Sequence, residues 1–361
     1  MKNRLQAFSI PKVDRKSEMG YFRLKVSATG YQPIQIERFS PHSHEGNLLP
    51  LSKLSHFYLG QEMLDTAFRA AYALHLSNFC CTLQRVGKRV EVTSIESDIP
   101  YEPYPSHRPP KRPKGIITFG ADIEYMIRHK KTTKFHALPL NSQVPKFEAE
   151  ADQALLRKGN KFYKPIFELH PRPQTTGEHL HIEMLKLKQK LEQRLKKSAY
   201  QVVTDPNPTG RFMLGGHLHF GNVQAGFNKT SQLDVLVTLP LSLLDHENSQ
   251  MRRFTYGGLG SVRLNHFNGF EYRSLSSWYN YIEQGLPLFN WIEWVVKNES
   301  LPYFFIPTQV ALAYTKNDRH SILLFVEKTF RWLKNNYKSS ADLVAIESFY
   351  KWIHSQRFPL S

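Results

Sequence analysis

Four segments of the chain place charged residues and histidines two positions apart within otherwise apolar stretches. Residues i and i+2 of a β-strand lie on the same face, so the polar side chains of each segment would point the same way. The predicted strands span residues 116–127, 164–172, 212–221 and 269–275, and their paired polar residues are Asp122 and Glu124; Glu168, His170 and Arg172; His217 and His219; and Glu271 and Arg273.

Each of these pairs has a simple structural explanation when taken alone. A carboxylate pair on an edge strand is usually a solvated face, and a single His-x-His pair often binds no metal. Four such strands in one sheet would gather carboxylates, imidazoles and guanidinium groups on one surface. Buried charges are costly unless they are compensated, so the pattern predicts a divalent cation and an anionic ligand. Carboxylates suit Mg²⁺ or Mn²⁺, and arginines suit phosphate.

Glycines stand beside these segments. Gly215, Gly216 and Gly221 flank the two histidines, and residues 257–260 form a glycine-rich loop just before Arg263. Small residues allow the backbone to approach a ligand closely. The sequence has neither a P-loop nor a Gly-x-Gly-x-x-Gly run, which disfavours those two modes of nucleotide binding.

The composition points to a globular protein with an anionic partner. The 361 residues carry a formal net charge of +17, and 41% are hydrophobic. The charge is spread along the chain and lacks the interleaved aromatics of a nucleic-acid groove, so nucleic-acid binding is not predicted. Cys80 and Cys81 are adjacent, which suggests buried thiols in a reducing compartment. No signal peptide and no apolar run of membrane-spanning length is seen, and we expect a cytoplasmic protein.

Six prolines within residues 100–114 divide the chain. Proline interrupts both helices and central strands, so this stretch is predicted to be a basic linker. It would separate an N-terminal α+β region, residues 1–99, from a larger body, residues 115–361. The N-terminal region shows no chemical constellation and is assigned an accessory role. In the body, strands come first and amphipathic helices follow, including one over residues 233–244 with a kink at Pro240, which predicts an α+β fold.

The polar segments resemble, in order, the motifs of the phage-type carboxylate–amine ligases of type 2. The matching stretches are residues 120–125 (GADIEY), 167–173 (FELHPRP), 215–221 (GGHLHFG) and 269–278 (GFEYRSLSSW), with residues 233–241 and 252–258 fitting the middle of the family. The resemblance implies a glutamine synthetase-like fold, in which a curved antiparallel sheet forms a funnel and helices pack on one side. It also implies ATP and Mg²⁺ or Mn²⁺, an acyl phosphate, and attack by an amine to form an amide.

The same resemblance implies roles for individual residues. Glu124, Glu168 and Glu271 would bind the metal with Asp122 nearby, and His219 or His217 would bind metal or phosphate. Arg273 would contact the transferred phosphate with help from Arg263. Arg172 is a further candidate for binding the cofactor, because arginines suit phosphate. His217 is included among the catalytic residues. Peptides and cell-wall components are the implied substrate classes. The sequence predicts neither the exact substrates nor the oligomeric state.

Two other functions fit parts of the sequence. A metal-dependent hydrolase could use His217 and His219 as zinc ligands, with further histidines at positions 170, 179, 181 and 246. The excess of carboxylates over histidines in the four strands, and the Glu-x-Arg pair, count against it. A non-catalytic protein could instead keep the ligase fold and use its positive charge to bind an acidic polymer or an assembly partner.

Overall fold

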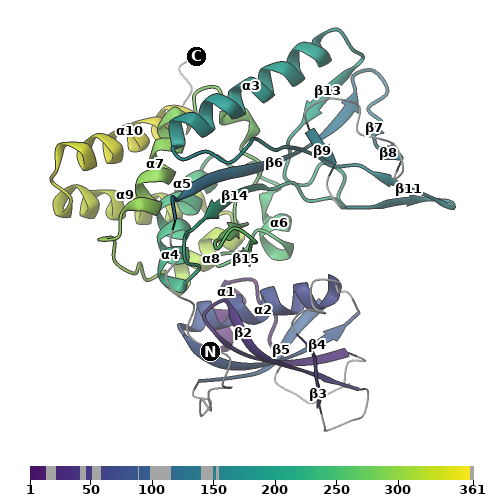
Figure 1. The fold of residues 1–361 in the computed structure, drawn as a ribbon, viewed down its shortest axis with the longest axis vertical. Helices are drawn as coiled ribbons and strands as arrows, with labels where there is room; N and C mark the ends of the chain where they lie inside the picture. Colours follow the sequence, from purple (N-terminus) through teal and green to yellow (C-terminus); the bar gives the residue numbers. More distant parts are fainter. Residues whose placement is uncertain are drawn as a thin grey trace.

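The structure is a computed structural model that describes residues 1–13, 22–40, 46–50, 58–87, 89–97, 115–139, 149–151 and 154–357. The predicted proline-rich linker, residues 100–114, lies outside the described residues. Figure 1 shows a smaller N-terminal part, drawn in purple and blue, beside a larger body drawn in teal, green and yellow. Two helices of the N-terminal part lie between its sheet and the body.

The N-terminal part is a five-stranded antiparallel sheet in the order β3-β2-β1-β4-β5. Helix α2 packs on this sheet and α1 packs on α2. The mixture of helix and strand expected of this region is present, and a hairpin between β4 and β5 turns at Gly87 with φ +60°. The elements are α1 (Lys2–Ala7), β1 (Phe22–Thr29), β2 (Gln32–Phe39), β3 (Gly46–Leu48), α2 (Tyr58–Leu74), β4 (Asn78–Val86) and β5 (Arg89–Ser97).

The body is built on an open antiparallel sheet in the order β15-β16-β14-β6-β12-β9, in which β7 and β13 also pair with β6. A small sheet, β10-β11-β8, extends from it. The strands are β6 (Thr118–His129), β7 (Phe135–His136), β8 (Leu138–Pro139), β9 (Ala149–Ala151), β10 (Leu156–Lys158), β11 (Lys161–Lys164), β12 (Phe167–Leu169), β13 (Tyr200–Val203), β14 (Gly216–Gly221), β15 (Val262–Leu264) and β16 (Phe270–Tyr272). The prediction of an α+β fold with an antiparallel sheet is confirmed.

Three of the four predicted polar strands are shorter than expected. The stretch 164–172 pairs as β12 only over Phe167–Leu169. Pro165 and Pro171 flank this strand, and proline has no N–H group to donate to a neighbouring strand. Strand β14 begins only at Gly216, and β16 ends at Tyr272. Glu168 and the polar pairs of β6, β14 and β16 nevertheless keep the shared face that their spacing predicted, whereas Arg172 lies beyond the end of β12.

Helices cover the apolar face of the sheet and close the body. Helix α3 packs against β6, β12 and α7. The helix expected over residues 233–244 is irregular one turn before Pro240, because residues 234–238 form a π-helical segment. The helices are α3 (Gly177–Lys196), α4 (Phe227–Leu233), η2 (Asp234–Thr238), α5 (Leu239–Ser242), α6 (Ser249–Thr255), η3 (Tyr279–Tyr281), α7 (Leu286–Lys297), α8 (Thr308–Lys316), α9 (Arg319–Asn336) and α10 (Ser340–Arg357).

The larger hydrophobic cluster among the described residues is continuous across the two parts of the molecule. The ring of Phe227 in α4 meets two tyrosines of the N-terminal part edge to face, Tyr31 at 5.0 Å and Tyr72 at 5.6 Å between ring centroids. The Tyr31 hydroxyl also donates to the Gly260 carbonyl at 3.1 Å. The two parts are therefore in direct, buried contact. Among the helices in the described part of the chain, none is long and apolar enough to cross a membrane.

Candidate active site

The register of the central sheet aligns the predicted polar residues across neighbouring strands. Glu168 stands opposite Glu124, and Asp122 opposite His217. Glu271 stands between His219 on one side and Arg263 on the other. Directly opposed residues of neighbouring strands point to the same face. The polar residues of β12, β6, β14, β16 and β15 therefore share one face of the sheet. Residues between them, such as Ile123, Leu218 and Tyr272, are buried in the core.

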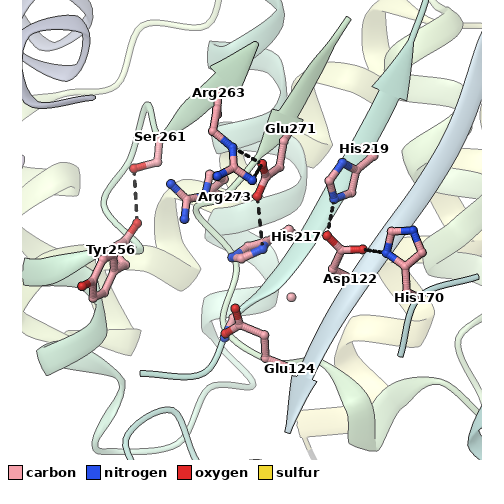
Figure 2. Close-up of polar contacts among 12 residues, drawn as sticks. Asp122, Glu124, His170, His217, His219, Tyr256, Ser261, Arg263, Glu271 and Arg273 are labelled. Atoms are coloured by element: carbon pink, nitrogen blue, oxygen red, sulfur yellow. Dashed lines mark hydrogen bonds and ion pairs between the residues drawn. The ribbon is translucent and has the colours of Figure 1, made fainter. Parts of the chain in front are cut away.

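Glu271 is the centre of a cluster of positive charges (Figure 2). Arg263 Nε donates to Glu271 Oε2 at 2.6 Å. On the other carboxylate oxygen, Oε1, Arg273 Nε lies at 3.1 Å and His217 Nδ1 at 3.3 Å. The Glu271 side chain is 3% exposed, whereas that of Arg263 is 55% exposed. The carboxylate thus anchors two arginines at the surface of the sheet, one of them open to solvent.

The charges in this cluster shift one another's ionisation. Burial alone would raise the pKa of Glu271, but the interactions with His217, Arg273 and Arg263 lower it below its usual range. Burial lowers the pKa of His217 to about 3; the Glu271 carboxylate opposes this shift, and the charges of Arg273 and Arg252 act in the same direction as burial. Glu271 is therefore ionised and His217 neutral near pH 7. Burial would lower the pKa of Arg273, yet Glu271 and then Asp65 raise it, so this guanidinium stays charged.

Asp122 lies between two histidines (Figure 2). Its Oδ2 pairs with His219 Nε2 at 2.5 Å, and its Oδ1 pairs with His170 Nδ1. Burial would raise the pKa of Asp122, but the bonds to both imidazoles outweigh burial and lower it. The structure thus separates the two histidines that the sequence could not distinguish. His219 belongs to Asp122 and His217 to Glu271.

Glu124 and Glu168 form the acidic end of the same face. Glu124 is buried, and its Oε2 accepts the N–H of Gly215 at 2.5 Å. Strand β9 places Glu150 opposite Glu168 in the register. Three glutamate positions therefore follow one another across β9, β12 and β6.

The donor groups suit a cation that shares its ligands with a phosphate. Within the described residues, no three His, Cys, Asp or Glu side chains come together as a ready-made metal site. Mg²⁺ commonly takes only one or two carboxylates from the protein and completes its shell with water and phosphate oxygens. Glu124 and Glu168, opposed on adjacent strands, fit that requirement. The metal-binding roles of Glu271, His219 and Asp122 stay predictions. In the structure, Glu271 pairs with two arginines, and Asp122 pairs with His219 and His170.

Two arginines have positions that the sequence did not reveal. Arg172 lies beyond the end of β12, is exposed, and acts electrostatically on Glu183 of α3. Arg252 of α6 is fully buried, and its guanidinium donates to the carbonyls of Arg273 at 3.0 Å and Ser274 at 3.1 Å. It braces the chain just after β16. In the sequence, Arg252 stands only within a segment that fits the family, and no role was predicted for it.

Comparisons with known proteins identify the family. Residues 119–358 match the family described as phage phiEco32-like COOH.NH2 ligase-type 2. The chain belongs to this family. The match begins in β6 and reaches the end of α10, so it includes every strand of the polar face. The N-terminal sheet and α2 precede the matched region of this type 2 ligase.

Other comparisons add less. A cryo-EM structure of Plasmodium falciparum glutamine synthetase aligns over 98% of this type 2 ligase chain and 98% of its own chain, with 11% identity and a TM-score of 0.33. No curated protein matches the sequence. The family, together with the geometry of the polar face, is what bears on the chemistry of this ligase.

Proposed function

We propose that this ligase uses ATP to join a carboxylate to an amine through an acyl phosphate. One observation carries the proposal. A buried glutamate anchoring two arginines, Glu271 with Arg263 and Arg273, lies on the same face of the sheet as the acidic pair Glu124 and Glu168. Phosphoryl transfer mainly requires positioning and neutralisation of phosphate charge. A cationic group beside a carboxylate pair supplies both binding partners for a phosphate and its divalent cation.

The residues of the site have different proposed roles. Arg273 and Arg263 bind the oxygens of the phosphoryl group, and Glu271 fixes the directions of their guanidinium groups. Glu124 and Glu168 would hold the divalent cation, Mg²⁺ or Mn²⁺. That cation would neutralise charge on the phosphates. The sequence suggested a catalytic role for His217; a pKa of about 3 makes it a poor base, so its proposed role is to orient Glu271.

The proposed reaction has two steps. A substrate carboxylate oxygen attacks the terminal phosphorus of ATP, and ADP leaves with the bridging oxygen. The amine nitrogen then attacks the acyl carbon, the bond from that carbon to the phosphate oxygen breaks, and the amine proton passes to solvent. The products are an amide, ADP and phosphate. Peptides and cell-wall components are the substrate classes to be tested first.

Nucleotide binding gives the direct test. Isothermal titration of the protein with ATP and Mg²⁺ should show saturable binding. Binding should be weaker in Arg273→Lys, and replacement of Glu124 should abolish the dependence of binding on Mg²⁺. Phosphate release should then appear with some carboxylate–amine pair in a panel of amino acids and peptides. Glu347→Gln, which alters an exposed ion pair between α9 and α10, is the matched control.

The other outcomes identify the alternatives. Stabilisation by Zn²⁺ alone, with nucleotide ineffective, would favour the metal-dependent hydrolase. Absence of any effect of nucleotide or metal would favour a binding protein that keeps the ligase fold. Either result would overturn the proposed ATP-dependent reaction.

A further inference from the structure

Helix α2 of the N-terminal part contacts the glycine-rich loop over residues 257–260, which leads into the site. Arg69 lies on α2 and is only 4% exposed. Its Nε donates to the carbonyl of Leu259 at 3.3 Å, and its Nη2 donates to the carbonyl of Phe8 at 2.7 Å. One guanidinium therefore links the N-terminal part to the loop over residues 257–260, which directly precedes β15.

The glycines of this loop leave room for the side chains of α2. A methyl group added at Gly258 would overlap the guanidinium of Arg69, and one added at Gly260 would overlap the ring of Tyr72. Gly260 has φ +82°, so its backbone alone favours glycine. Gly258 lies outside the left-handed region, and the main obstacle to a side chain there is Arg69. The loop is shaped to receive this arginine.

The loop over residues 257–260 leads directly to Arg263 and Arg273, the two arginines that pair with Glu271. The carbonyl of Ser261, next after the loop, accepts the N–H of Arg273 at 3.0 Å. Two residues later Arg263 pairs with Glu271. From the opposite face, buried Asp234 accepts the N–H of Gly260 at 2.9 Å and also accepts from the hydroxyl of Tyr272. The loop, β15 and β16 are thus held as one unit, and Arg69 is its contact with α2.

Asp65 supports the same placement of α2. It lies four residues before Arg69, on the same side of the helix. Burial raises the pKa of the Asp65 carboxyl, and the charges of Arg69 and Arg273 partly oppose this rise. The side chain is half-buried in the structure and within electrostatic reach of the arginine cluster. This turn of α2 therefore borders the site.

We propose that Arg69 is a positioning residue of the active site, which holds the glycine loop so that Arg263 and Arg273 meet Glu271 and the ligand. The N-terminal part is then an integral component of the site. Arg69 is needed to align β15 with β16, whatever ligand these strands bind. Only the effect on nucleotide affinity rests on the proposed ligase function.

The first test replaces Arg69 with methionine, which keeps most of the side-chain volume. Hydrogen exchange should become faster in the segments Val262–Leu264 and Phe270–Tyr272 and stay unchanged in α9 and α10. The affinity for ATP and Mg²⁺ should fall by about 10- to 100-fold, the loss of one hydrogen bond to a charged group. The binding stoichiometry should stay at the wild-type value. A purely structural role would instead reduce the stoichiometry and leave the affinity of the folded molecules unchanged.

Arg85→Met is the matched control. Arg85 also contacts α2, through Glu62 at 3.2 Å, but from within the N-terminal sheet and away from the loop. Exchange in β15 and β16 and the nucleotide affinity should both stay at wild-type values in this variant. Equal effects of the two substitutions would show that general loosening of α2 is responsible, and would overturn the positioning role of Arg69.

A double-mutant cycle tests the contact from the other side. Gly258→Ala should displace the guanidinium and reproduce the faster exchange and weaker binding of Arg69→Met. In Arg69→Ala the space beside Gly258 is free, so adding Gly258→Ala should change the hydrogen exchange and the nucleotide affinity little further. Additive effects of the two changes would contradict the proposal. If Arg69→Met did not fold, Gly258→Ala alone would decide, since it keeps the arginine and its charge. If wild-type protein bound no nucleotide, the proposed function would fail and the exchange measurements would still test the positioning role.

Discussion

Substitution of Glu271 by glutamine tests whether its carboxylate stabilises the free protein. The side chain keeps its shape and loses its charge. Removal of one partner from a buried ion pair costs about 3–5 kcal/mol. The contact with Arg263 contributes little, because that arginine is 55% exposed and can be hydrated instead. Arg273, with a side chain 27% exposed, is the costlier partner to leave uncompensated. We expect Glu271→Gln to lower the free energy of unfolding by about 3 kcal/mol.

Urea unfolding in buffer without metal or nucleotide measures this difference, read as a shift in midpoint at constant slope. The control is Glu347→Gln, which removes an ion pair whose side chains are 37% and 45% exposed. That exposed pair should contribute less than about 1 kcal/mol.

The opposite result would be equally informative. If Glu271→Gln were as stable as the wild type, or more stable, the two arginines would not compensate the buried carboxylate. Its retention would then cost stability, as expected of a group kept for a cation. The reasoning that Glu271 anchors Arg273 and Arg263 would be refuted, and the predicted metal-binding role would be favoured.

Three further substitutions test other parts of the site. The pKa of His217 is about 3, and an unfolded imidazole titrates near 6.5. Between these two values the unfolded state binds one proton more than the folded state. His217 should therefore lower the free energy of unfolding by up to about 1.4 kcal/mol per pH unit as the pH falls from 6.5 toward 3. Urea unfolding across that range should show that His217→Gln removes this contribution to the pH dependence of stability. Asp122→Asn should cost about 1–3 kcal/mol in the same assay, since it weakens bonds to both imidazoles, and an unchanged midpoint would contradict this. Arg252→Met should leave the carbonyl of Arg273 without its donor and speed exchange at the end of β16, and wild-type exchange there would exclude the bracing role.

Much of the candidate site could be predicted from sequence because strand geometry is local. The i, i+2 spacing of Asp122 with Glu124, and of Glu271 with Arg273, determines a common face wherever the strand lies. The structure keeps those faces even though β12, β14 and β16 are shorter than expected. The amphipathic helices that follow the strands in the body were also predicted, since an apolar stripe at helical spacing is a local feature.

The neighbours of each side chain could not be predicted, because register is a property of two strands. A slip of two residues would keep every face and exchange every partner. The register places Asp122 opposite His217 and Glu271 opposite His219, yet the side chains pair diagonally, His219 with Asp122 and His217 with Glu271. Nor does α2 carry a local pattern that predicts a role for Arg69. The sequence alone determined which residues face the same way, and the tertiary structure decided which of them meet, because contacts between distant segments depend on how the whole chain packs.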